Sequence, residues 1–170
     1  MLHYPVHRKE KGFTLIEMIV VTVIVSIIGA IAIPSFFGLL NRNRGNRAIA
    51  EIEGALKEAQ KRAIRSGRSC TIAINTATNT ISNNAAADTC LLTTRNIDTD
   101  FTLTTSRADI TFSGKGNISL APQTPVIVVS FPNGGSNQQR CVVIENTLGS
   151  IRTGEYAGAI PVVPLPASCQ

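Results

Sequence analysis

The stretch Lys11-Gly12-Phe13-Thr14-Leu15-Ile16-Glu17 opens an apolar run that continues to Leu40 and has no charged residue from Met18 onward. About 20 apolar residues suffice to span a bilayer as a helix, and this run exceeds that length. A secretory signal would have an apolar core of only about 7 to 15 residues. We therefore predict that residues 13–40 form a membrane-anchoring helix rather than a cleaved secretory signal.

Cations flank this run on both sides. Three precede it within residues 8–11, and three follow it within residues 42–47. The cytoplasmic end of a membrane helix carries the excess of Lys and Arg. The first group therefore favours a cytoplasmic N-terminus, and the second group favours the reverse orientation. Charge alone leaves the orientation of the anchor open.

A second helical pattern follows the apolar run. Apolar residues recur there at intervals of three and four, which places them on one helical face; they are Ile49, Ile52, Leu56, Ala59 and Ala63. With Gly67 as a C-terminal cap, we predict one helix from Phe13 to Ser66, about 75 Å long at 1.5 Å per residue. Its second half is amphipathic, and Pro34 predicts a kink because proline removes a backbone hydrogen bond.

After Gly67 the sequence changes to short β-rich runs separated by Gly, Pro and Asn, notably at 114–116 and 132–135. The runs are 71–74, 80–82, 101–104, 110–112, 117–120, 126–131 and 141–144. Such spacing is typical of antiparallel strands joined by hairpins. We therefore predict an α+β fold in which the long N-terminal helix packs against an antiparallel sheet in two layers. The proline-rich tail, 157–170, is expected to be extended and non-helical.

The chain contains four cysteines, Cys70, Cys90, Cys141 and Cys169. They form no Cys-x-x-Cys pair, so a zinc site is not indicated. Two disulfides are the natural use of four cysteines in an exported domain. Three pairings are possible, and we favour the pairing of sequence neighbours, Cys70 with Cys90 and Cys141 with Cys169.

The N-terminal stretch resembles the type IV prepilin signature, which type IV pilins, minor pilins and the pseudopilins of type II secretion share. The resemblance implies that prepilin peptidase removes a cytoplasmic leader, residues 1–12, by cutting after Gly12, and that Phe13 is then N-methylated. Glu17 would neutralise the terminal amine of a neighbouring subunit during assembly, since a buried carboxylate and a buried ammonium are tolerated as a pair. A kink at Pro34 also agrees with this family.

Two later segments, Ile110-Thr-Phe-Ser-Gly114 and the stretch from Cys141 to Gly154, resemble the GspH/FimT group of minor pilins and pseudopilins. The resemblance implies a single-pass inner-membrane precursor with a leader (1–12), a transmembrane and filament-core helix (13–40) and an exported pilin-like domain (41–170). The implied partners are prepilin peptidase, other pilin or pseudopilin subunits, the inner-membrane assembly platform and the lipid bilayer. The implied function is assembly or capping of a type IV pilus or a type II secretion pseudopilus.

Catalytic chemistry is not indicated by the residues present. His3 and His7 are the only histidines, and both lie in the leader. A mature chain without histidine cannot form a Ser-His-Asp site or a His-ligated metal centre. Gly114-Lys-Gly116 lacks the spacing of a phosphate-binding loop. We therefore expect no enzyme, no cofactor and no metal.

DNA binding is the alternative function. Some members of the group resemble DNA-uptake subunits with a Gly-Arg-x-Arg motif near the C-terminus, and Gly149-Ser-Ile-Arg152 occupies the matching positions. Only Arg152 remains of the arginine pair, and losing a phosphate-binding cation weakens affinity for DNA. We therefore rank a DNA-binding minor pilin of a competence pilus second.

The distribution of charge supports this ranking. The chain has a net charge of +5, and residues 41–68 alone hold eight cationic and three acidic residues. Residues 69–170 hold five cationic and six acidic residues. The basic charge thus belongs to the helix, where anionic lipid headgroups or filament neighbours account for it better than nucleic acid does.

Overall fold

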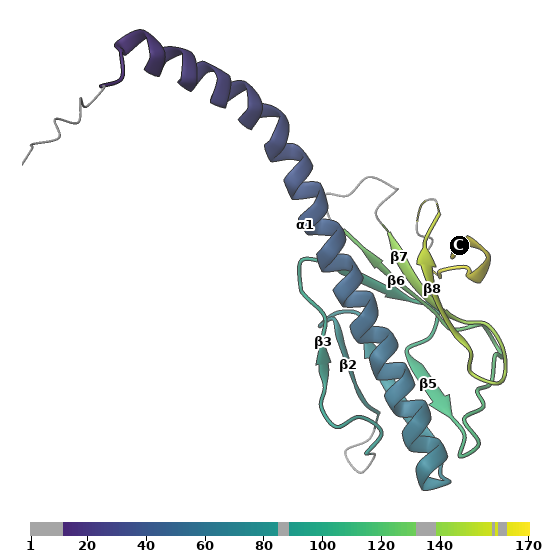
Figure 1. The fold of residues 1–170 in the computed structure, drawn as a ribbon. Coiled ribbons are helices and arrows are strands. Elements are labelled where there is room, and N and C mark those ends of the chain that lie inside the picture. The colour runs from purple at the N-terminus through teal and green to yellow at the C-terminus, as the bar shows by residue number, and fades with distance from the viewer. Residues whose placement is uncertain (1–11, 85–88, 132–138, 158, 160–162) are drawn as a thin grey trace, which may run out of the picture. The chain divides into compact units, whose positions relative to one another are not determined.

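The structure is a computed structural model that describes residues 12–84, 89–131, 139–157, 159 and 163–170. The elements in chain order (Figure 1) are α1 (Leu15–Ser66), β1 (Cys70–Asn75), β2 (Thr80–Asn83), β3 (Arg95–Asn96), β4 (Thr102–Thr105), β5 (Asp109–Phe112), β6 (Val126–Ser130), β7 (Arg140–Ile144), β8 (Ile151–Glu155) and the short 3-10 helix η1 (Pro166–Ser168). The chain divides into two compact units, Met1–Leu40 and Asn41–Gln170, and α1 contributes to both.

The part of α1 in the second unit has the predicted buried face. The five apolar residues at intervals of three and four, from Ile49 to Ala63, are all buried, and Ile52 and Leu56 are completely so. The helix ends at Ser66, after which Gly67 takes a φ of 65°. This left-handed conformation is the glycine cap expected from the sequence, because a residue with a Cβ adopts it only at a cost.

The described strands form two antiparallel sheets of four strands each. The strand order is β3-β2-β1-β5 in the first sheet and β4-β6-β7-β8 in the second. Pairing of Ile72 with both Asn83 and Ile110 sets the register of the first sheet, and pairing of Val142 with Ile127 and Thr153 sets that of the second. The predicted α+β class, a helix packed on antiparallel β-structure, is confirmed, although the β-structure is divided between two sheets.

Several strand boundaries differ from the prediction. Strands β3 and β8 were not predicted, because neither has an alternating apolar pattern. The predicted strand 117–120 is wrong: only Ile118 pairs there, in an isolated bridge with Phe112. The tail is not wholly non-helical, since η1 forms one 3-10 turn in it. The leader up to Lys11, the turn at 132–135 and Pro161 lie outside the described residues.

Two apolar clusters form the core of the second unit. The larger one joins the buried face of α1 to both sheets through residues such as Ile72, Ile127 and Val142. The smaller one lies on the opposite face of β6 and β7 and consists of Val126, Val128, Cys141, Val143, Tyr156 and Cys169. Strands β6 and β7 are therefore buried on both faces, which explains their unbroken apolar sequences.

The C-terminal tail covers the smaller cluster. The backbone N–H of Glu155 donates to the carbonyl of Gln170 at 2.7 Å, and the N–H of Gln170 donates back at 2.9 Å. Tyr156 and Cys169 form an isolated antiparallel bridge beside this pair. The tail thus lies next to the end of β8 (Figure 1) and closes the outer face of the second sheet.

Candidate functional site

The segment before α1 is exposed in the described chain. Gly12 and Phe13 have no regular secondary structure, and the Phe13 residue is 78% exposed. A Cβ added at Gly12 would meet nothing within 4 Å. The bond between these two residues is therefore open to a protease, and cleavage after Gly12 with methylation of Phe13 stays a prediction.

Thr14 and Glu17 bond to each other at the first turn of α1. The backbone N–H of Thr14 donates to Glu17 Oε2 at 3.4 Å, and the N–H of Glu17 donates to Thr14 Oγ1 at 3.3 Å. This reciprocal pair is a capping box, which satisfies two backbone donors that have no partner within the helix. The carboxylate predicted to act in assembly therefore also caps the helix of its own chain, a role that the Thr-x-x-Glu spacing could have indicated.

The following turns of α1 expose apolar side chains in every direction. Val25 and Ile28 are each 61% exposed and Ile31 is 73% exposed, although all three are strongly apolar. A helix that is apolar all round is buried in a larger assembly or in a bilayer. Among the described residues, however, no helix is both long enough and apolar enough to cross a membrane. The predicted transmembrane segment is thus not confirmed.

The helix continues through the predicted kink. Its assignment runs without interruption from Leu15 to Ser66 and includes Pro34. The bend expected at Pro34 stays a prediction.

The four cysteines form two disulfides, Cys70–Cys90 and Cys141–Cys169. This is the sequence-neighbour pairing that we favoured. The first bridge ties β1 to the segment after β2, and the second ties β7 to the tail. Within the described residues, no group of three or more His, Cys, Asp or Glu side chains could hold a metal ion.

Gly149 lies where α1 approaches the turn between β7 and β8. Its φ is 77°, and a Cβ at this position would lie 2.5 Å from Gln60 Nε2. Gln60 Nε2 is within hydrogen-bond distance of three carbonyls, those of Gly116, Leu148 and Gly149, at 3.0, 3.1 and 3.3 Å. Glycine at this position of the candidate DNA motif is therefore required by the left-handed backbone and by the carbonyl oxygen of Gly116, which would lie 2.9 Å from a Cβ.

Arg152 has both sides of its guanidinium occupied. Its Nε donates to the carboxylate of Glu145, and its Nη2 donates to the carbonyl of Cys169 at 2.9 Å. A guanidinium that is held by a carboxylate and a carbonyl has fewer donors left for a phosphate. The structure therefore gives Arg152 a role in fastening the tail, whereas its DNA contact stays untested.

Sequence reasoning missed Gln60 and Glu145. Gln60 is a polar residue beside the apolar face of an amphipathic helix, a place where a solvated side chain is the ordinary expectation. Glu145 directly follows β7 and precedes Arg152 by seven residues. Only the turn between the two strands brings these charges together, so no short spacing rule indicates the pair.

These features together define a class of protein. An N-terminal helix that begins in a capping box exposes an apolar first part, and its amphipathic second part packs on antiparallel sheets. This is the architecture of a type IV pilin-like subunit. The disulfide-tied tail completes the domain.

Comparison with known proteins agrees with this class. A family model described as "Prokaryotic N-terminal methylation motif" matches residues 7–33, and one described as "Type II transport protein GspH" matches residues 48–148, more than half of the chain. The chain belongs to the GspH family, as the sequence resemblance predicted. Proteins of this family are structural pilin or pseudopilin types rather than enzymes.

Individual relatives match over shorter lengths. A fimbrial protein of Pseudomonas aeruginosa is 43% identical over 61 residues, which are 36% of this chain and 39% of that protein. The type IV major fimbrial protein FimA of Dichelobacter nodosus is 36% identical over 59 residues, which are 35% of this chain and 37% of that protein. The match thus spans about two fifths of the length of these curated relatives.

A solved structure shows the same fold. The crystal structure of the type IV minor pilin FimU of Pseudomonas aeruginosa aligns with a TM-score of 0.54 at 19% identity, covering 76% of this chain and 97% of that one. A second crystal form of FimU aligns with a TM-score of 0.53. The likeness supports the pilin-like fold.

Proposed function

We propose that this chain is a minor pilin or pseudopilin that takes part in assembling or capping a type IV pilus or a type II secretion pseudopilus. The observation that carries the proposal is the exposed apolar surface of α1 between Leu15 and Ile31. Such a surface needs a cover of matching chemistry. The apolar helices of other subunits provide that cover in a filament, and a bilayer provides it before assembly.

In this proposal the precursor is inserted into the membrane, processed and then assembled. It is a single-pass protein of the inner membrane, its leader lies in the cytoplasm, and prepilin peptidase cuts it after Gly12. The assembly platform moves the processed chain from the bilayer into the filament. The N-terminal motif and the apolar sequence from 13 to 40 support these proposed steps.

Glu17 is the only charged residue between Phe13 and Leu40. In the filament we assign it to the terminal amine of the adjacent subunit, since each of these charges is expensive to bury alone. In the single chain it caps the N–H of Thr14. Pairing with the amine requires the charge of a carboxylate. A capping box does not, because glutamine can also complete it and carries no charge.

Comparing Glu17→Gln with Glu17→Ala therefore tests the proposal. Both variants should stay in the membrane fraction and be processed, and both should enter filaments much less than the wild type, as measured in sheared filament preparations. Normal incorporation of Glu17→Ala would overturn the assembly role. Normal incorporation of Glu17→Gln alone would assign Glu17 to helix capping instead of charge pairing.

Processing is tested separately. Replacing Gly12 with a bulky residue should leave the leader attached, as seen by mass spectrometry of the N-terminus. A mature Phe13 terminus in that variant would contradict the proposed cleavage site.

The alternative, DNA uptake through Arg152, is less well supported because Glu145 and Cys169 already engage this guanidinium. A gel-shift assay with wild type and Arg152→Ala distinguishes the two functions. Salt-sensitive binding that the substitution abolishes would favour DNA uptake, provided that the assay contains no reductant and that mass spectrometry finds the Cys141–Cys169 disulfide intact in both proteins.

A further inference from the structure

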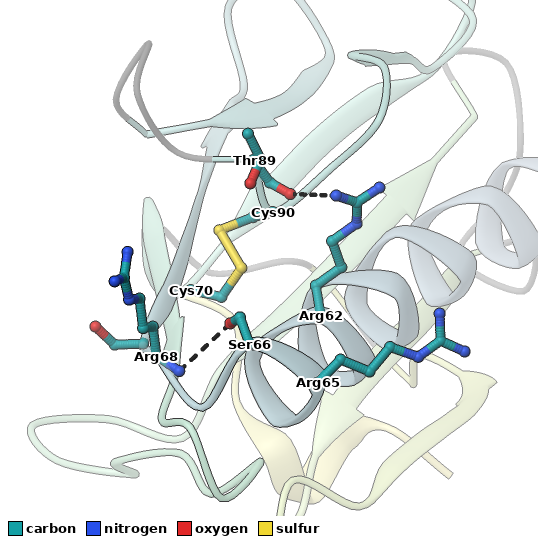
Figure 2. A pocket seen from close by; sticks show the side chains of 8 residues that line it. Arg62, Arg65, Ser66, Arg68, Cys70, Thr89 and Cys90 are labelled. Carbon is teal, nitrogen blue, oxygen red and sulfur yellow. Dashed lines mark hydrogen bonds between the residues drawn. A yellow bond between two sulfur atoms is a disulfide. The ribbon is translucent and has the colours of Figure 1, made fainter.

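Three arginines line a hollow beside the C-terminal end of α1. The hollow has a volume of about 510 Å³, and Arg62, Arg65 and Arg68 line it together with Ser66, Thr89 and the Cys70–Cys90 disulfide. Figure 2 shows the disulfide between Arg62 and Arg68, with Thr89 beyond it. A covalent bridge therefore forms part of the wall and ties the start of β1, just after Arg68, to the segment that contains Thr89.

Among the described residues, most of the guanidinium donors in this hollow have no partner. Arg62 Nη1 donates to the carbonyl of Thr89 at 3.0 Å, which orients this side chain toward the hollow. Across the ranges that the structure describes, no hydrogen bond or ion pair engages the guanidinium of Arg65 or Arg68. Both residues are exposed. None of the described contacts therefore has to break before these two guanidinium groups bind an anion.

The nearest acids on the same helix are already paired. Glu58 accepts from Arg95 Nη2 at 2.8 Å and from the backbone N–H of Leu92 at 2.9 Å. Glu53 pairs with Lys57 at 2.5 Å. The positive charge of the hollow is thus left without an internal counterion in the described part of the chain.

A second hollow, of about 400 Å³, adjoins the first. It shares Arg62 and Arg65 with the first hollow and adds Lys57, Lys61 and Glu58, whose carboxylate accepts from Arg95. Lys57, Lys61 and Arg65 are four residues apart, so they form one stripe about 12 Å long on the helix, in which Glu53 already pairs with Lys57. Two adjoining hollows along such a stripe fit a chain of several anionic groups better than a single ion.

The lining suits an oxyanion. A guanidinium presents a planar fork of donors that matches the oxygens of a phosphate or of a carboxylate, and the spacing of the cations favours a chain of phosphates. Lipid headgroups are a poor source, because Arg65 lies about 36 Å along the helix from Asn41, where the exported unit begins. A phosphodiester chain, by contrast, carries charges at regular intervals and can follow the stripe.

We propose that Lys61, Arg62, Arg65 and Arg68 bind consecutive phosphates of a phosphodiester chain. The site is separate from Arg152 and does not depend on the assembly role of Glu17. It also gives the basic charge of the second half of α1 a phosphodiester ligand, in place of the lipid headgroups or filament neighbours that the sequence favoured.

The test uses the processed full chain in nonionic detergent, with a fluorescently labelled single-stranded oligothymidine as the probe and anisotropy as the readout. For three or four phosphate contacts, affinity should fall about 20- to 50-fold between about 50 and about 200 mM NaCl. In Arg65→Gln/Arg68→Gln, one or two contacts remain and the fall should be only about 3- to 7-fold. Arg62 is left intact because it contacts Thr89.

The matched control is Arg42→Gln/Lys115→Gln, which removes the same charge from two exposed residues outside both hollows. It should keep the wild-type salt dependence, and all variants should keep the Cys70–Cys90 disulfide and the wild-type melting temperature. Three outcomes would overturn the proposal. They are no binding of the oligothymidine at low salt, a loss of salt dependence in the control as large as in Arg65→Gln/Arg68→Gln, and displacement of the probe by pyrophosphate as effective as that by unlabelled oligothymidine at the same phosphate concentration. Stronger competition by an oligoglutamate of equal charge would also overturn it, in favour of an acidic protein surface.

Discussion

Arg152 Nη2 donates a hydrogen bond of 2.9 Å to the carbonyl of Cys169, 17 residues further along the chain. The Nε of the same guanidinium pairs with Glu145. One side chain therefore connects β8, the segment after β7 and the tail. Because Cys169 is also bonded to Cys141, a polar contact and a covalent bond hold the tail at the same point.

Replacing Arg152 with alanine should loosen the tail. The side chain is 41% exposed, so we expect a loss of about 1 kcal/mol in the free energy of unfolding. The more specific effect is faster reduction of Cys141–Cys169 by dithiothreitol, measured by mass spectrometry of alkylated thiols. Lys115→Ala, an exposed cation elsewhere in the same unit, should change neither quantity. Unchanged reduction kinetics in Arg152→Ala would contradict the fastening role.

Gly149→Ala should destabilise the second unit. The left-handed conformation costs a residue with a Cβ about 1–2 kcal/mol. The new methyl group would also displace Gln60, whose Nε2 lies within hydrogen-bond distance of three carbonyls. Urea denaturation measures the loss. Gly54→Ala is the control: it lies on the exposed side of α1, where a Cβ meets nothing within 4 Å, so it should stabilise by about 0.5–1 kcal/mol. Equal effects at the two glycines would disprove this explanation.

The two disulfides should differ in what their loss exposes. Removal of either by a double Cys→Ser substitution should cost about 2–4 kcal/mol, because each closes a loop of 20 or 28 residues. Only Cys141→Ser/Cys169→Ser should also release the tail from the smaller apolar cluster. It should therefore increase the fluorescence of the dye ANS in the folded protein, whereas Cys70→Ser/Cys90→Ser should not. An increase in both variants would show that the cluster does not depend on the tail bridge.

Leu56→Ala should weaken the docking of α1 on the sheets. Leu56 is completely buried in the larger cluster, and such a truncation typically costs about 2–5 kcal/mol. Leu148→Ala removes the same atoms from a residue that is 70% exposed, and it should change stability by less than about 0.5 kcal/mol. Guanidinium denaturation of both variants makes the comparison. Similar losses would mean that the helix contributes little to the core.

The parts of the fold that depend on periodicity were predictable. The buried face of α1 from Ile49 to Ala63 repeats every three or four residues, and β6 and β7 are short apolar runs. Strand β8 was not predictable in this way, because Ile151 is its only large apolar residue. It is a strand because β7 supplies a partner for each of its five residues. Division into two sheets likewise depends on pairings between distant segments, which a local pattern does not contain.

The candidate site was predictable only where a motif is local. Gly12, Phe13 and Glu17 lie within one short stretch, and the family model matches there. In contrast, Gly149 and Arg152 match a local motif but contact Gln60 and Cys169, which are far away in sequence. Their role in the structure is therefore set by tertiary contacts that their own spacing does not reveal.

The cover of β6 and β7 also imposes an order on biogenesis. Cys169 follows its partner Cys141 by 28 residues, so the outer apolar face of the second sheet is synthesised well before the segment that closes it. This apolar face therefore stays uncovered in the nascent chain until the tail has been synthesised. Covalent closure of the domain then needs an oxidant, because the Cys141–Cys169 bond forms only when two thiols lose two electrons.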